Sequence, residues 1–305
     1  MARIGLVLHP RRNCSLAVGQ IASWTSTHGV ELVAASDDVE RLGLTGVVPV
    51  TVAELAGGSD GIIALGGDGT LLGAMRLVGR HPVPVLGVNF GHLGFLAEVE
   101  GPDLDAALTA MAEGRSTTDV RSCLVVRNAA GESLAFNDAV LARVPGEGLV
   151  EAMLSVAGRR YGRYRCDALI LATPMGSTAY SYAAGGPVVS PGAAGILVTP
   201  SAPLSGISRS VLLGPGEPLQ LELTGGRPAI ELDGVLSGRL DPGQVLEVEL
   251  RPDAGRLVRI EGSRAADRSR VKLSLLDLPL LPQELRELVP EDLRSRLAEE
   301  VPGDG

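Results

Sequence analysis

The sequence predicts an α/β + β fold, in which a Rossmann-like parallel α/β domain is followed by a β-sandwich-like domain. Three observations predict it. Continuous apolar runs alternate with helical segments in the first third of the chain, short runs separated by Gly, Pro and Asp fill the middle, and 305 residues are enough for two cores. The expected domains span residues 1–115 and 116–268, and residues 269–305 form a C-terminal segment and tail.

In the first domain, the apolar runs are continuous, which indicates a parallel sheet with helices on both faces. The expected strands are residues 3–8, 61–65 and 83–88. The expected helices are residues 15–28, 70–78 and 103–113, the last with an acidic residue in its first turn.

In the second domain, Gly, Pro and Asp separate short apolar runs at close intervals, a pattern typical of a β-sandwich. The expected strands are residues 122–127, 150–156, 168–172, 195–198, 210–213, 218–223, 229–232, 245–250 and 257–261. The end of the chain differs, because residues 275–281 are apolar and residues 282–299 are charged and predict a helix. We expect this tail to return towards the N-terminal domain.

The composition excludes several classes of protein. A formal net charge of -9 argues against nucleic-acid binding, and 3% aromatic residues leave few rings to stack on bases. The single lysine, Lys272, lies far from any glycine loop, so a Walker-type P-loop is excluded. Cys14, Cys123 and Cys166 match no metal-ligand spacing and are expected to be reduced thiols. Without a signal peptide or a membrane-spanning apolar run, we expect a cytoplasmic protein with no membrane partner.

A glycine loop joins the apolar run at residues 61–65 to the next helix. It reads GGDGT at residues 66–70. Glycines let the backbone approach a ligand closely, and the N–H groups at a helix start favour anions. Asp68 would face bound phosphates, where a carboxylate either holds Mg²⁺ or accepts the proton of an attacking hydroxyl. The alternative is that Asp68 only caps the helix, but a cap does not require three surrounding glycines.

A second loop, residues 173–180, reads TPMGSTAY and is followed by AGGP at residues 184–187. Its small residues let hydroxyls and backbone groups reach a nucleobase or a ribose, and Tyr180 adds an aromatic face. On the residues alone, the segment could equally be a turn of the β domain with a buried tyrosine.

Both loops resemble known kinase motifs. GGDGT resembles the signature shared by NAD kinases, by diacylglycerol and sphingosine-type lipid kinases and, more loosely, by phosphofructokinases. TPMGSTAY is more specific, because it resembles the TPTGSTAY segment of NAD kinases. Along residues 3–280 the resemblance continues in family order through VNFGHLGFL at residues 88–96, Phe136-Asn137-Asp138, Arg165 and Asp167, and Leu232-Asp233-Gly234.

The resemblance implies an NAD kinase. This family transfers the γ-phosphoryl of ATP, or sometimes of polyphosphate, to the 2′-hydroxyl of the adenosine ribose of NAD, which gives NADP. The resemblance also implies ATP and NAD as substrates, Mg²⁺ or another divalent cation carried by the ATP, and no metal ligands in the chain. It implies a site between two domains in a homodimer or homotetramer, with residues borrowed from a neighbouring subunit.

Roles for single residues follow from the same resemblance. Asp68 would be the catalytic base. The expected binding residues are Gly67 and Gly69 at phosphate or ribose, Asn137 at the adenine, Asp138 at the nicotinamide ribose, Arg165 at the added phosphate, Asp167 and Met175 at the nicotinamide end, Thr178, Ala179 and Tyr180 around the adenine, and Gly66, Thr70 and Ser177 beside them.

Four positions depart from the family's pattern. Met175 replaces a Thr or Ser, Ala168 a Gly, Asp138 the usual Glu and Leu204 a His. These changes fall on the expected nicotinamide side of the site. Two alternatives therefore stay open: a divergent kinase acting on another adenosine-like or nucleoside metabolite, and a non-catalytic NAD(P)-binding sensor. A lipid kinase is less favoured, because that group shares only the first motif.

Overall fold

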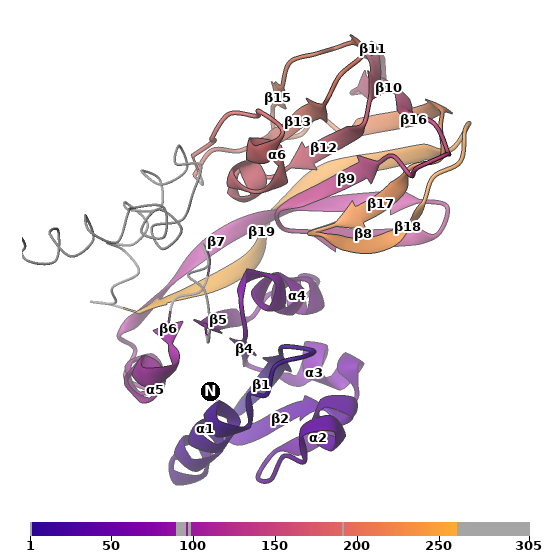
Figure 1. Cartoon of the computed structure of the whole chain (residues 1–305). Helices are drawn as coiled ribbons and strands as arrows, with labels where there is room; N and C mark the ends of the chain where they lie inside the picture. The colour runs from indigo at the N-terminus through magenta and orange to yellow at the C-terminus, as the bar shows by residue number, and fades with distance from the viewer. Residues whose placement is uncertain (1, 90–95, 97–98, 191, 261–305) are drawn as a thin grey trace, which may run out of the picture. The chain divides into compact units, whose positions relative to one another are not determined.

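The computed structural model describes residues 2–89, 96, 99–190 and 192–260, all within one compact unit. Its first part contains five neighbouring parallel strands in the order β3-β2-β1-β4-β5, of which β1, β2, β4 and β5 are labelled in Figure 1, and the short strand β6 Val99–Glu100 pairs parallel with β5. Their bounds are β1 Arg3–Leu8, β2 Glu31–Ala35, β3 Val48–Val50, β4 Gly61–Leu65 and β5 Pro84–Asn89. The strands predicted at residues 3–8 and 61–65 are confirmed, whereas β2 and β3 were not predicted.

Helices cover both faces of these strands, as the continuous apolar runs predict. Their bounds are α1 Ser15–His28, α2 Ser36–Leu42, α3 Val52–Gly58, α4 Asp68–Val78 and α5 Leu104–Ala112. On one face, α1 and α5 pack over an apolar cluster that contains Leu6 and Leu86. On the other face, α3 and α4 pack over a cluster that contains Ile62 and Val85.

The second part is a sandwich of two β layers. One layer is a six-stranded antiparallel sheet in the order β15-β13-β12-β9-β17-β18. Its strands are β9 Asp138–Ala142, β12 Ala168–Ala172, β13 Ile196–Ser201, β15 Val211–Leu213, β17 Ala229–Leu232 and β18 Val235–Arg239. The facing strands are β7 Ser116–Asn128, β8 Gly131–Ala135, β10 Val150–Val156, β11 Arg159–Cys166, β14 Ser205–Gly206, β16 Leu219–Gly225 and β19 Val245–Ile260. A core that includes Leu171, Leu154 and Leu221 fills the space between the layers.

One long strand joins the two parts. β19 pairs antiparallel with β16 near its start and parallel with β5 near its end, so both parts share a thirteen-stranded sheet. Figure 1 shows β19 beside β7, its antiparallel partner along most of its length. The sequence predicted two strands, at residues 245–250 and 257–261. They form one strand instead, because the ladder with β7 continues across a register shift between Arg251 and Gly255.

The predicted α/β + β fold is confirmed, and the domain limits near residues 115 and 268 stay predictions. Several predicted features lie outside the described residues, namely most of the VNFGHLGFL segment, the apolar run at 275–281 and the helical tail. In the part of the chain that is described, no helix is long and apolar enough to cross a membrane. Cys14, Cys123 and Cys166 are free and buried.

Candidate active site

Three segments that are far apart in the sequence meet at one end of the six-stranded sheet. β9 and β12 are antiparallel, and Asp138 at the start of β9 lies opposite Ala172 at the end of β12. β17 runs antiparallel to β9 on its other side, and Leu232 at its end lies opposite Ala139. Three segments therefore lie close together at this end of the sheet. They are the second loop, which follows β12, the Phe136-Asn137-Asp138 turn, which leads into β9, and Asp233, which follows β17.

The second loop lies directly on the turn that carries Asn137. The Thr173 hydroxyl donates to the Phe136 carbonyl at 2.6 Å, and the Thr173 N–H donates to the Asn137 carbonyl at 2.9 Å. Gly176 approaches most closely, since a Cβ atom added to it would lie 2.0 Å from the Asn137 carbonyl oxygen. Only glycine fits this contact, so close packing against the turn explains why TPMGSTAY has a glycine at this position.

Residues of the second loop divide into buried and accessible ones. Ser177 is buried, and its hydroxyl donates to the Pro174 carbonyl at 2.7 Å and accepts from the Val189 N–H at 2.9 Å. Thr178 and Ala179 are half-buried, and Tyr180 is exposed. The residues expected around an adenine are thus the accessible ones, whereas the Ser177 hydroxyl holds the loop together.

The Met175 side chain is half-buried and packs against the apolar cluster that contains Phe136 and the buried face of α4. Methionine is flexible and fills irregular apolar gaps well. This departure from the family's pattern therefore has a packing reason within the chain itself.

The first loop leaves the start of α4 open. The helix begins at Asp68, and its N-cap, Gly67, makes no side-chain cap bond. The N-cap position belongs to Gly67 and not to Asp68, and the Asp68 carboxylate accepts a hydrogen bond from the Leu96 N–H at 3.0 Å. Apart from the adjoining residues and the backbone of α4 itself, no atom of the described residues lies within 4 Å of where a Cβ would stand on Gly67 or Gly69. This space beside the helix N-terminus suits an anionic ligand.

Gly66 has a different reason to be glycine. A Cβ there would lie 2.3 Å from the Thr70 hydroxyl oxygen and 3.2 Å from the His9 Cβ. Gly66 and Thr70, both expected to bind substrate, thus pack against each other in this structure.

Asp138 is a buried carboxylate, with only 4% of its surface exposed. Burial, and then the negative charges of Asp233 and Glu231, raise the pKa of Asp138 to about 7, although a hydrogen bond from the Tyr180 backbone lowers it. The protonated form is therefore favoured in the folded chain well above the ordinary value of 3.8.

This pKa predicts a stability effect with a defined sign. Between pH 3.8 and about pH 7, the folded chain holds a proton on Asp138 that the unfolded chain has lost. The contribution of Asp138 to the free energy of unfolding must then fall as pH rises through this window. We expect urea titrations to show Asp138→Asn gaining stability relative to the wild type from pH 4.5 to pH 7. A difference that does not change with pH would contradict the assignment.

Arg165 and Asp167 do not join the other predicted site residues within one chain. Arg165 pairs with Glu151 at 2.9 Å, and Asp167 pairs with Arg143 at 3.0 Å. Asp167 directly precedes β12, whereas Thr173 directly follows it. The five residues of β12 between them make six steps of extended chain, which span about 20 Å.

Two residues at the site were missed by the sequence analysis. Thr173 fastens the second loop to the turn, and Arg76 on α4 forms an ion pair with Asp233 at 2.6 Å. The Arg76–Asp233 pair connects the helix of the first loop to the end of β17. A regular helix pattern gives no signal for such a contact, because its partner is 157 residues away.

Comparisons with known proteins agree along most of the chain. A family model described as the ATP-NAD kinase N-terminal domain matches residues 4–116, and one described as the ATP-NAD kinase C-terminal domain matches residues 136–260. NAD kinase 1 of Streptomyces avermitilis is 35% identical over 92% of this chain and 89% of its own. An NAD kinase of Symbiobacterium thermophilum is 42% identical over 70% of this chain and 78% of its own.

Two solved structures share the fold. The crystal structure of a yeast NADH kinase complexed with NADH matches with a TM-score of 0.81 and 22% identity, over 92% of this chain and 90% of that one. An NAD kinase from Archaeoglobus fulgidus in complex with ATP matches with a TM-score of 0.64 and 23% identity, over 89% and 98%.

Proposed function

The chain belongs to the ATP-NAD kinase family, and we propose that it transfers the γ-phosphoryl of ATP to the 2′-hydroxyl of the adenosine ribose of NAD. The observation that carries the proposal is the first loop, where Asp68 stands at an open helix N-terminus beside two glycines with free space around them. The proposed substrates, ATP and NAD, make the cytoplasm the compartment in which we expect it to act.

In the proposed reaction, the helix N-terminus binds phosphate and Asp68 accepts the proton of the attacking 2′-hydroxyl. Phosphoryl transfer proceeds through a loose transition state, so the hydroxyl loses its proton late and a carboxylate is a sufficient base. Mg²⁺ enters with ATP as part of the substrate. Among the described residues, no group of three or more His, Cys, Asp and Glu side chains is arranged to hold a metal ion.

The proposed adenine pocket lies between the turn and the second loop. Asn137 is half-buried, and its side-chain amide makes no hydrogen bond within the described part of the chain, so it is available to pair with a base edge. Tyr180, the last residue of the second loop, offers an exposed aromatic ring. Asp138 would accept a hydrogen bond from the nicotinamide ribose, and its deprotonated form accepts the stronger one because it is charged.

An enzyme-coupled assay tests the proposal. Purified protein is incubated with Mg-ATP and NAD, and a dehydrogenase that uses NADP alone reports the product. Parallel reactions replace NAD by NADH and ATP by polyphosphate. We expect NADP to form. Binding of NAD without turnover would support the sensor, and ADP release with another adenosine compound but not with NAD would support the divergent kinase.

We further propose that Arg165 and Asp167 complete the site of a second copy of this chain, because one chain keeps them about 20 Å from the second loop. The complete enzyme would then be a homodimer or homotetramer. In a symmetric pair, each site would combine Asp68 from one subunit with Arg165 from the other.

Subunit mixing tests this arrangement. Asp68→Asn and Arg165→Met are each expected to be nearly inactive, but co-expressed together they form mixed dimers in which one site carries both changes and the other carries neither. About a quarter of wild-type activity should return for freely mixed dimers. The matched control mixes Asp68→Asn with Asn137→Ala, which lie in the same chain's loops and should not complement. Light scattering that finds an active monomer would contradict the proposal.

A further inference from the structure

The carboxylate of Asp233 is fully buried and receives four hydrogen-bond donors. Its Oδ2 accepts from Arg76 Nη1 at 2.6 Å and from the Phe136 N–H at 3.1 Å. Its Oδ1 accepts from the N–H groups of Asn137 at 2.7 Å and Asp138 at 3.2 Å. A carboxylate has about four lone-pair positions, so these donors use its full capacity.

Asp233 also shapes the connection between β17 and β18. It adopts a left-handed backbone conformation with φ of +50°, and Gly234 follows with φ of +75°. An Asp-Gly pair with both φ angles positive is the preferred two-residue link in a β-hairpin, and Asn-Gly serves equally well. Asp233→Asn therefore keeps the hairpin while it removes the charge and replaces one acceptor oxygen with a donor.

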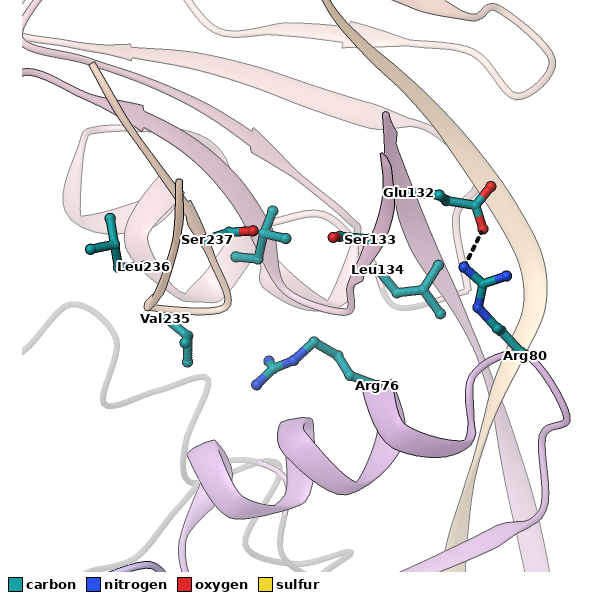
Figure 2. A pocket seen from close by; sticks show the side chains of 9 residues that line it. Arg76, Arg80, Glu132, Ser133, Leu134, Val235, Leu236 and Ser237 are labelled. Carbon is teal, nitrogen blue, oxygen red and sulfur yellow. Dashed lines mark ion pairs between the residues drawn. The ribbon is translucent and has the colours of Figure 1, made fainter. Parts of the chain in front are cut away.

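Arg76 brings the helix of the first loop to this carboxylate. It lies eight residues after Asp68 on α4, which corresponds to about 12 Å along the helix axis. Figure 2 shows its side chain extending from α4 towards the hairpin that carries Val235. Apolar contacts also hold α4 against Phe136, but such contacts are not directional. The short charge-assisted bond to Asp233 adds the directional constraint.

We propose that Asp233 and Arg76 are positioning residues, which hold the Asn137-Asp138 turn in a fixed position relative to the helix that begins with Asp68. The inference rests on the proposed function, because only an NAD kinase reaction needs Asp68 and the turn to act on the same NAD molecule. Asp68 would act on the 2′-hydroxyl while the turn binds the two ends of the same NAD molecule. A positioning error of about 1 Å between them can cost as much as 10²-fold in rate.

The charge of Asp233 provides a readout that a purely structural role would not move. Asp138 is faced by the carboxylates of Asp233 and Glu231 and by the Tyr180 backbone, and Arg76 lies behind Asp233. In the wild type, KM for NAD should fall as pH rises past about 7, when Asp138 loses its proton. Removing the charge of Asp233 should move this response to lower pH, because one cause of the raised pKa is gone.

Four variants test the proposal in the full chain: Arg76→Met, Asp233→Asn, the double variant and Arg80→Met. Arg80 is the matched control, since it lies two residues past the end of α4, pairs with Glu132 at 3.2 Å and lines the same cavity of about 310 Å³ (Figure 2). We expect Arg76→Met and Asp233→Asn each to lower kcat/KM for NAD at least ~10-fold, and Arg80→Met to change it less than twofold. The double variant should lose no more than the worse single one, because the two residues act as a unit.

Hydrogen exchange gives a readout that needs no substrate. The amides of Phe136, Asn137 and Asp138 should exchange at least ~10-fold faster in Asp233→Asn and in the double variant than in the wild type or Arg80→Met. Unchanged exchange, or losses in kcat/KM that add in the double variant, would overturn the inference. If the wild type forms no NADP, the proposed function fails and the exchange rates alone decide the inference. If Arg76→Met does not fold, Asp233→Asn alone decides it.

Discussion

Asp68→Asn is expected to lower kcat for NADP formation by at least ~10²-fold, the lower end of what a positioned general base contributes. Asparagine has nearly the same shape as aspartate but cannot take the proton of the 2′-hydroxyl. KM for NAD should change much less, because the turn and the second loop are untouched. The coupled NADP assay, run at saturating Mg-ATP with varied NAD, separates the two parameters.

The same substitution should leave the fold intact. Gly67, and not Asp68, is the N-cap of α4. The Oδ1 of an asparagine can still accept a hydrogen bond from the Leu96 N–H, which in the wild type lies 3.0 Å from the Asp68 Oδ1. The matched control is Asp105→Asn, an exposed acidic residue in the first turn of α5. Both variants should unfold at nearly the wild-type temperature, and Asp105→Asn should keep wild-type turnover. Near-normal turnover in Asp68→Asn would mean that another group takes the proton.

Elements with long apolar runs and clear ends were predictable from the sequence. The strands at residues 61–65 and 150–156 and the helix at 15–28 have the predicted bounds. Short elements were not, because α2 and α3 have seven residues each and β3 has three, too few for a period to show. One usable signal was overlooked, since Thr51 and Glu54 form a capping box at the start of α3.

The site was predictable where its chemistry lies in one continuous segment. GGDGT and TPMGSTAY each predict a loop, and in the structure the second loop packs on the Phe136-Asn137-Asp138 turn. Contacts between distant segments were not predictable. The pairing of Arg76 with Asp233 depends on how α4 lies against the sandwich, and no local pattern encodes that. The distance of Asp167 from the second loop, in contrast, follows from the length of β12, which has the bounds predicted at residues 168–172.

Gly176→Ala is expected to have the second large effect, because it adds a single methyl group where there is no space for it. The new Cβ would lie 2.0 Å from the oxygen, 2.4 Å from the carbon and 2.6 Å from the Cα of Asn137. All three are backbone atoms. The Asn137 N–H is fixed by Asp233 and its carbonyl by Thr173, so the turn cannot easily move aside.

The strain of Gly176→Ala must therefore move the second loop away from the turn, and with it Thr178, Ala179 and Tyr180. Overpacking of this kind typically costs about 1–3 kcal/mol of folding free energy, and a displacement of about 1 Å in the adenine pocket can lower kcat/KM for NAD by as much as ~10²-fold. Gly192→Ala is the matched control, because the nearest atom to its Cβ would be the Ser190 Oγ at 4.0 Å and its backbone is not left-handed. Urea titration and the coupled assay on both variants make the comparison. If Gly176→Ala retains wild-type stability and kinetics, the second loop does not pack on the Asn137 backbone as described. The proposed position of the adenine pocket between the turn and the second loop would then be contradicted.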